Sequence, residues 1–287
     1  MRAIYKKEMR GFFTQMSGYV FLGFLLLLIG IWFSFLNLLS FSANFQNVLS
    51  NVTVFFFILV PTLTMRVFSE EAKQKTDQLL FTSPLTVAQI VFGKFFASIS
   101  LFLIGVIISI LLPLMIAGHA ELPVSRIVGT YIGFFLLGVS AISVGLFISV
   151  LTENQIIAAV GTMGAIFVMF LMDAIALGMP TSTFASLMFV VFIIAITTAI
   201  WYNGAKNILV AVCFGAFATV FAVVLYLINN AVYDGIIVRA LQWFSVFARF
   251  NSFANGIVHS SDVVYYVSFT LLFIYLTINV IEKRRWR

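Results

Sequence analysis

The chain has 287 residues, of which 62% are hydrophobic and only 9% are charged, and its formal net charge is +6. Soluble domains average roughly 25% charged residues, so this composition and the mean hydropathy of +1.13 exclude a water-soluble fold. The sequence predicts an all-α polytopic membrane helix bundle, organised as a single domain over 1–287. With one cysteine, the chain offers neither a disulfide framework nor a cysteine metal site.

Residues 2–17 predict an amphipathic helix that lies on the inner membrane surface. Apolar side chains share one face of this helix: Tyr5, Met9, Phe12, Phe13 and Met16. The basic side chains fall mostly on another face. The predicted membrane-surface anchors are Lys6, Lys7, Arg10, Phe12 and Phe13. The alternative interpretation is a plain basic flank that only orients the first span.

Apolar segments long enough to cross a membrane follow. A helix of about 20 apolar residues crosses a hydrocarbon core of roughly 30 Å. By this measure the candidate spans are 19–40, 52–68, 90–117, 126–151, 155–178, 184–202, 207–228 and 263–281. The sequence thus predicts about eight transmembrane helices, or six if the tight hairpin 184–228 dips into the membrane without crossing. Pro61 and Pro113 are expected to kink their spans.

Lysine and arginine determine the predicted orientation. With the N-terminus inside, 13 of the 16 lysines and arginines lie on the inner side. The other three are Arg126, Arg239 and Arg249. The positive-inside rule therefore predicts an even number of spans, with both termini cytoplasmic.

The stretch from Met65 to Lys94 is the one long polar segment of the chain. Ser69 is expected to cap a short helix, with acidic residues in its first turn and lysines further along, as the helix dipole favours. Glu71 and Lys75 are four residues apart, which predicts a stabilising pair on one face.

A turn and a second helix follow this short helix. Thr82, Ser83 and Pro84 end the first helix. Thr86 and Gln89 form a capping box that begins the next, apolar helix. A short polar helix and turn over 69–85 are therefore held between two spans, where a partner in the aqueous phase can contact them.

The segment 230–262 is too apolar for an ordinary outer loop. It predicts short helices at the outer interface, with Trp243 among the anchors.

Motifs for catalysis do not occur. There is no glycine-rich phosphate loop with its lysine, so nucleotide hydrolysis by this chain is not expected. His119 and His259 are far apart without metal-ligand spacing, and no serine or cysteine has a plausible histidine base. We predict no catalytic, cofactor-binding or metal-binding residue, no enzymatic activity and no nucleic-acid partner.

Ionisable residues within spans are few. Asp173 is the strongest candidate for an ion path, although an interfacial carboxylate is the simpler interpretation. Lys94 and Arg126 lie near helix ends and are expected to snorkel. The lack of charges at mid-depth disfavours a stand-alone channel or ion-coupled secondary transporter, and a membrane-embedded enzyme is disfavoured further.

Two further features have open interpretations. Glu153 marks a very short inner turn, which is either a simple loop or a second contact with a cytoplasmic partner.

Small residues could allow helices to approach one another closely, and packing within the chain is preferred over a dimer interface. These residues are Gly129, Gly133, Gly138, Gly145, Gly161 and Gly164.

The order of these features resembles a known family. A basic amphipathic helix precedes the first span, and the second span ends in RVFSEEAKQKTDQLLFTSPLT, residues 66–86. QIVFGKF follows at 89–95, and the last span ends in EKRRW at 282–286. The chain is similar to permease subunits of type 2 ATP-binding-cassette transporters, in the branch of gliding-motility-type and copper-enzyme-maturation permeases. The resemblance is most specific over 60–95, and the hairpin at about 180–230 departs from the six-span pattern.

The resemblance implies a partnership and a mechanism. Two permease chains, identical or sister copies, would pair in the lipid bilayer of a bacterial plasma (inner) membrane and bind separate ATPase subunits that hold ATP and Mg. The segment 69–85 would be the coupling helix, inserted into a groove of the ATPase. The implied contacts are Glu70, Glu71, Lys73, Thr82, Ser83 and Pro84. The expected function is that of an ATP-driven exporter, with the stand-alone channel or ion-coupled carrier as its alternative.

Overall fold

The structure is a computed structural model that describes residues 1–76, 85–116, 123–205 and 208–285. Within these ranges every regular element is a helix, which confirms the all-α class. The chain divides into two compact units. Unit 1 contains Met1–Phe170 and Val246–Arg287, and unit 2 contains Leu171–Ser245. A single domain over the whole chain stays a prediction.

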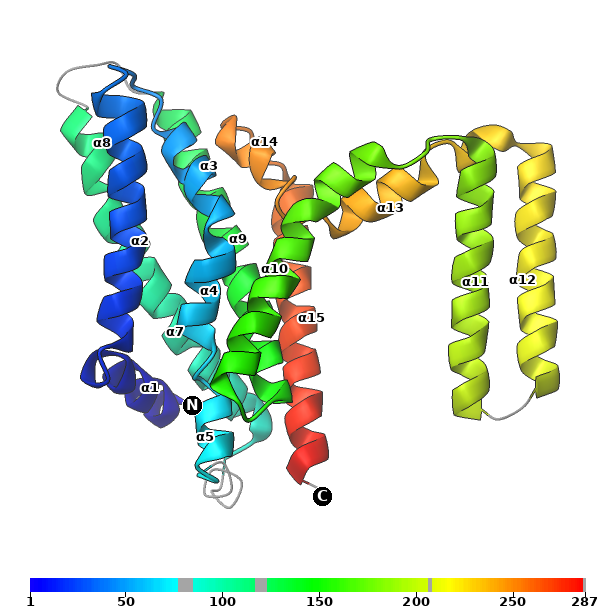
Figure 1. Ribbon diagram of the computed structural model, residues 1–287, viewed down its shortest axis with the longest axis horizontal. Helices are drawn as coiled ribbons and strands as arrows, with labels where there is room; N and C mark the ends of the chain where they lie inside the picture. Colours follow the sequence, from blue (N-terminus) through cyan, green and yellow to red (C-terminus); the bar gives the residue numbers. More distant parts are fainter. Residues whose placement is uncertain (77–84, 117–122, 206–207, 286–287) are drawn as a thin grey trace. The chain divides into compact units, whose positions relative to one another are not determined.

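Unit 1 carries most of the helices (Figure 1). In its N-terminal part these are α1 (Arg2–Thr14), α2 (Ser17–Phe33), the π-helix η1 (Ser34–Leu38), α3 (Gln46–Val54), α4 (Phe56–Thr64) and α5 (Ser69–Lys73). They are followed by α7 (Val87–Ser109), α8 (Leu111–Ile116), α9 (Val124–Leu151) and the first part of α10 (Gln155–Gly178). The C-terminal part adds α14 (Phe250–Ala254) and α15 (Ser260–Arg285).

Five helical segments of the described chain are long and apolar enough to span a membrane, or up to seven if each of two bent helix pairs counts as one span. The five are Ser17–Leu38, Val87–Ile116, Val124–Leu151, Gln155–Gly178 and Ser260–Arg284. The protein is therefore a multi-pass membrane helix bundle. The predicted count of eight exceeds the upper end of this range by one, because the described apolar helix in the predicted span 184–202, Thr183–Ala199, is short. The alternative of six spans lies within the range.

Two predicted spans are broken, and only the break between α7 and α8 lies close to its predicted proline kink. The pair α3 and α4 bends by 66°. The break lies at Phe55 and not at Pro61, because the Phe55 amide donates to the i−3 carbonyl of Val52 at 2.9 Å and tightens the turn. Between α7 and α8 the break falls at Ile110. Pro113 has no N–H for the carbonyl four residues earlier, that of Ser109, where α7 ends.

Helix α9 is the central helix of unit 1, and α3, α4, α7, α14 and α15 all contact it. Small residues make this possible. A Cβ at Gly133 would overlap Phe253 of α14, one at Gly138 would overlap the Phe102 ring of α7, and one at Gly145 would overlap Thr64 of α4. These glycines pack within the chain, as the sequence predicted. Gly164 differs, because a Cβ there would meet no atom within 4 Å.

Unit 2 is a helical hairpin with a short helical return. It contains α11 (Thr183–Ala205) and α12 (Ile208–Ile228), which contact each other, and then the 3-10 helix η2 (Asn230–Tyr233) and α13 (Ile236–Phe244). The Tyr233 hydroxyl donates to the Ala222 carbonyl at 2.7 Å and fixes η2 against α12. The segment 230–262 therefore forms short helices (η2, α13 and α14), as predicted, and its position at the outer interface stays a prediction.

Gly133→Ala is expected to lower the stability of the bundle by about 1–3 kcal/mol, because the new methyl group overlaps the base of the buried Phe253 side chain. Gly164→Ala is the matched control. It places the same methyl group in open space, where alanine favours the helix. Thermal unfolding of the chain in detergent measures both. Equal midpoints for the two variants would contradict the packing role of α9.

Candidate functional site

Lys94 is a buried cation at the start of a membrane span. It lies in α7 with its side chain only 1% exposed, and its ammonium group has three close acceptors. Nζ is 2.8 Å from Glu8 Oε1 of α1, 2.8 Å from Glu71 Oε2 of α5 and 2.7 Å from the Val67 carbonyl oxygen. An ammonium group has three donors, so all of them are satisfied by protein.

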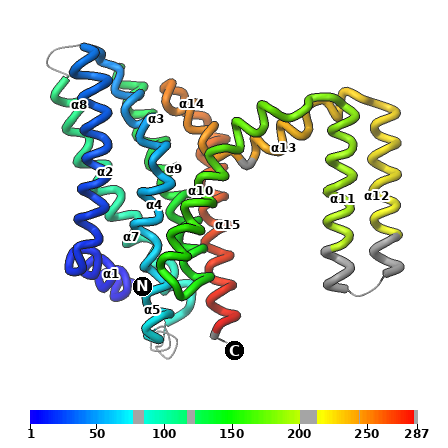
Figure 2. The backbone as a smooth tube through the Cα atoms, in the orientation of Figure 1, coloured from blue at the N-terminus to red at the C-terminus, as the bar shows by residue number. Residues whose placement is uncertain are grey.

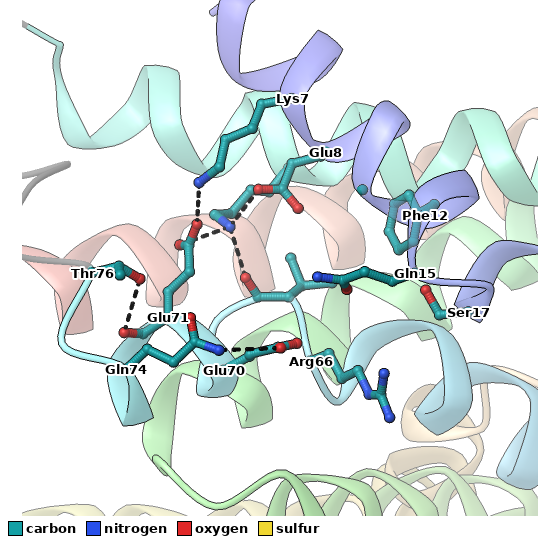
Figure 3. A pocket seen from close by; sticks show the side chains of 13 residues that line it. Lys7, Glu8, Phe12, Gln15, Ser17, Arg66, Glu70, Glu71, Gln74 and Thr76 are labelled. Atoms are coloured by element: carbon teal, nitrogen blue, oxygen red, sulfur yellow. Dashed lines mark hydrogen bonds and ion pairs between the residues drawn. The ribbon is translucent and has the colours of Figure 1, made fainter.

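A second lysine completes this group. Lys7 Nζ lies 2.8 Å from Glu71 Oε1, so the Glu71 carboxylate bridges two cations (Figure 3). We refer to Lys7, Glu8, Glu71 and Lys94 as the Lys94 cluster. Its two positive and two negative charges cancel. The cluster therefore joins α1, α5 and α7 without leaving a net buried charge, which would be costly.

Electrostatics favour the charged forms in this cluster. Burial raises the pKa of the Glu71 carboxyl, but the charge of Lys94 and the hydrogen bonds from Lys7 and Lys94 outweigh it, so the pKa lies below its ordinary value. Burial alone would lower the pKa of the Lys7 ammonium. The hydrogen bond and charge of Glu71 and the charge of Glu8 outweigh burial, so the pKa of Lys7 lies above its ordinary value.

Helix α1 is held against α7 by local packing. Ile4 lies over Gly93, where a Cβ would approach the Ile4 side chain to 3.0 Å. The Tyr5 hydroxyl donates to Ser100 Oγ at 3.0 Å. These contacts bring Glu8, one turn further along α1, to Lys94. The predicted capping box of Thr86 and Gln89 is present and fixes where α7 begins.

Helix α5 is positioned by α9, because Ser149 Oγ accepts from the amides of Phe68 (3.2 Å) and Ser69 (3.3 Å). The prediction that Ser69 caps α5 is wrong: Ser69 is the first helical residue, and its hydroxyl donates to the Met65 carbonyl.

The predicted Glu71–Lys75 pair does not form. Helix α5 ends at Lys73, and Lys75 has a φ of 57°, which destroys the i, i+4 geometry that such a pair needs. Glu71 pairs instead with Lys7 and Lys94.

A cavity of about 440 Å³ adjoins the cluster. It lies between the end of α1 and the segment that contains α5. Its lining residues are Lys7, Glu8, Gly11, Phe12, Gln15, Ser17, Arg66, Val67, Glu70, Glu71, Gln74, Thr76 and Lys94. The cavity has the size of a small-ligand site.

The predicted partner contacts have different surroundings. Glu71 belongs to the cluster and Glu70 lines the cavity. Lys73 and Glu153 are exposed. Glu153 follows Ser149 by four residues, so the turn after α9 lies near α5. The other predicted contacts, Thr82, Ser83 and Pro84, lie outside the described residues.

The predicted membrane anchors also separate into two groups. Lys6 and Arg10 are exposed, and Phe13 stacks edge-on against Tyr19 with ring centroids 5.3 Å apart. Lys7 is paired with Glu71, and Phe12 is buried in the core of unit 1. The surroundings of Phe12 are therefore protein, whereas the Lys7 side chain remains 59% exposed. A membrane-surface role stays a prediction for Lys6, Lys7, Arg10 and Phe13.

Sequence reasoning missed Glu8 and Ser149 and misjudged Lys94. Lys94 was expected to snorkel, but it is buried because two carboxylates and a carbonyl replace its water. A signal was present: a lysine eight residues into an apolar helix needs a partner, and the basic helix α1 contains a single glutamate.

Among the described residues, no group of three or more His, Cys, Asp or Glu side chains could hold a metal ion.

Lys94→Met is expected to destabilise the protein by about 3 kcal/mol, because it leaves Glu8 and Glu71 without their buried cation. Adding Glu8→Gln and Glu71→Gln should recover most of this loss, since no uncompensated carboxylate then remains. Lys73→Met is the control, an exposed lysine without an ion pair to any described residue. Thermal unfolding in detergent measures all four proteins. A Lys94→Met variant as stable as the control would disprove the role of the cluster.

The stability that the cluster contributes is expected to depend on pH. Glu71 contributes above its ordinary pKa of 4.5 and loses its contribution as the pH falls through its lowered value. Lys7 contributes below 10.5 and loses its contribution as the pH rises through its raised value. The difference in unfolding temperature between wild type and Glu71→Gln should therefore be largest above pH 4.5 and shrink as the pH falls below 4.5. Glu153→Gln, which changes an exposed carboxylate, is the control. A difference that stays constant as the pH falls below 4.5 would rule out the Glu71 contribution.

No family model matches this chain, and no curated protein matches it. The resemblance to type 2 permeases therefore stays a prediction that rests on the residues quoted for it.

Proposed function

We propose that this chain is the permease subunit of an ATP-driven transporter, and that α5 is the coupling helix through which a separate ATPase subunit acts on it. The observation that carries the proposal is the anchoring of α5. A short polar helix between two apolar helices is tied by a buried carboxylate–ammonium contact to the first turns of α7.

This anchoring suits the transmission of force. A push on α5 reaches α7 through Glu71 and Lys94, and it reaches α1 through Glu71 and Lys7. Packed elements held by such contacts move as rigid bodies. A loop without these contacts would absorb the push in its own backbone.

The docking surface on the permease is best assigned to exposed residues near α5. Lys73 and Glu153 are exposed, whereas Glu71 is occupied by its two lysines. The ends of α1, α5 and α15 lie at the same end of unit 1 (Figure 2). The basic residues of these segments favour the cytoplasmic side of a plasma membrane for this end.

The mechanism follows from this arrangement. The ATPase would hydrolyse ATP, with Mg, on its own chain. Its closure would move α5 and shift α4 and α7 with it. A second permease copy would complete the path for the substrate, and export is the favoured direction.

Charge reversal at both exposed positions, Lys73→Glu with Glu153→Lys, is expected to weaken ATPase binding and stimulation about tenfold or more, as at other interfaces with close charge pairs. The assay uses the purified chain with the ATP-binding-cassette ATPase encoded beside its gene. Glu282→Lys, an exposed reversal near the end of α15, is the control. Full stimulation by the double variant, or substrate flux through the lone chain in ATP-free liposomes, would overturn the proposal. The flux result would favour a channel or ion-coupled carrier.

A further inference from the structure

The cavity beside the Lys94 cluster contains two charged groups that the cluster does not use. Its lining has three cations (Lys7, Arg66, Lys94) and three carboxylates (Glu8, Glu70, Glu71). The cluster neutralises four of these. Arg66 and Glu70 remain.

Neither remaining charge is neutralised by the part of the chain that the structure describes. The Arg66 guanidinium makes no side-chain hydrogen bond or ion pair to a described residue. The Glu70 carboxylate accepts only a long hydrogen bond, 3.4 Å, from the Gln74 amide. The two residues are one helical turn apart, since the Glu70 amide donates to the Arg66 carbonyl. The cavity thus presents one cation and one anion a short distance apart.

Neutral donors extend the cationic side of the cavity. Gln15 and Ser17 line it, and Figure 3 shows both at the end away from Lys7, beyond Glu70 and toward Arg66. Their side chains donate no hydrogen bond to a described residue. A guanidinium with a hydroxyl and an amide beside it suits the oxygens of a phosphate.

The mouth of the cavity adjoins apolar surface. Gln15 and Ser17 flank Met16, which is 71% exposed, and Tyr19 and Val20 at the start of α2 are exposed as well. Because α2 is a candidate membrane span, these side chains suit contact with acyl chains.

We propose that the cavity binds the headgroup of a zwitterionic phospholipid with a primary ammonium, such as phosphatidylethanolamine. The phosphate lies at Arg66, Gln15 and Ser17, and the ammonium donates to Glu70. The acyl chains leave over Met16, Tyr19 and Val20. The net charge of the lining is zero, which disfavours a purely anionic headgroup. Choline has no N–H to donate to the carboxylate.

This site requires only that the protein lies in a membrane, and it is tested without any ATPase. The purified full-length chain is exchanged into detergent with equal amounts of phosphatidylethanolamine, phosphatidylglycerol and phosphatidylcholine, and native mass spectrometry counts the retained lipids. We expect one retained phosphatidylethanolamine, about tenfold more than either other lipid, because the charged hydrogen bonds of its headgroup are complete only there.

Two variants test the location. Gly11 lines the cavity, and a Cβ there meets no atom within 4 Å. Gly11→Leu should therefore fill the cavity while it favours helix α1, and it should abolish the preference without loss of fold. Arg66→Gln should reduce retention about tenfold. Lys73→Gln, an exposed lysine outside the cavity, is the matched control.

Three outcomes would overturn the proposal. The first is equal retention of the three lipids. The second is unchanged preference in both Gly11→Leu and Arg66→Gln. The third is equally tight binding of soluble glycerophosphoethanolamine, which carries the same charges without acyl chains and would assign the site to a free metabolite. Each outcome leaves the proposed ATPase contact at Lys73 and Glu153 untouched.

Discussion

A buried ammonium group cannot exist without partners, and the cytoplasmic end proposed for unit 1 is built around this constraint. Removing a lysine from water costs several kcal/mol unless opposite charges and acceptors replace the water. Lys94 meets the requirement with Glu8, Glu71 and the Val67 carbonyl. These groups come from two stretches of chain, α1 and the segment 67–71, and Lys94 lies on a third, α7. Each stretch must therefore stay in place as long as the lysine stays charged and buried.

The packing around α9 places these stretches within reach of one another. Gly145 allows α4 to approach through Thr64, and Ser149, one turn later, accepts the amides of Phe68 and Ser69. The small residues of α9 therefore set both the depth of α4 and the start of α5. The cluster then connects α5 sideways to α1 and α7. Packing against α9 therefore positions α4 and α5, and the ion pairs of the Lys94 cluster link α5 to α1 and α7.

Local features of the fold could be predicted from the sequence, and contacts between distant residues could not. The capping box of Thr86 and Gln89 involves residues three apart, so the sequence alone located it. Lys94 and Glu8 are 86 residues apart, and no local pattern indicates which carboxylate a lysine will meet. The Glu71–Lys75 prediction is wrong for the same reason. Local spacing indicated Lys75 as the partner, but Glu71 pairs with Lys7 and Lys94, which are distant in the sequence. The bend at Phe55 could not be predicted either, because a single tight turn breaks an otherwise continuous apolar run.

The position of the three ionic residues along the chain has a consequence for biogenesis. Glu8 and Glu71 both precede Lys94, so a growing polypeptide exposes two carboxylates before their shared counter-ion has been synthesised. Chains are made from the N-terminus, and early parts begin to fold first. Until α7 emerges, the first helix has only Lys7 to tie it to Glu71. Once Lys94 has been synthesised, it would complete the Lys94 cluster and fix α1 and α5 in their final arrangement.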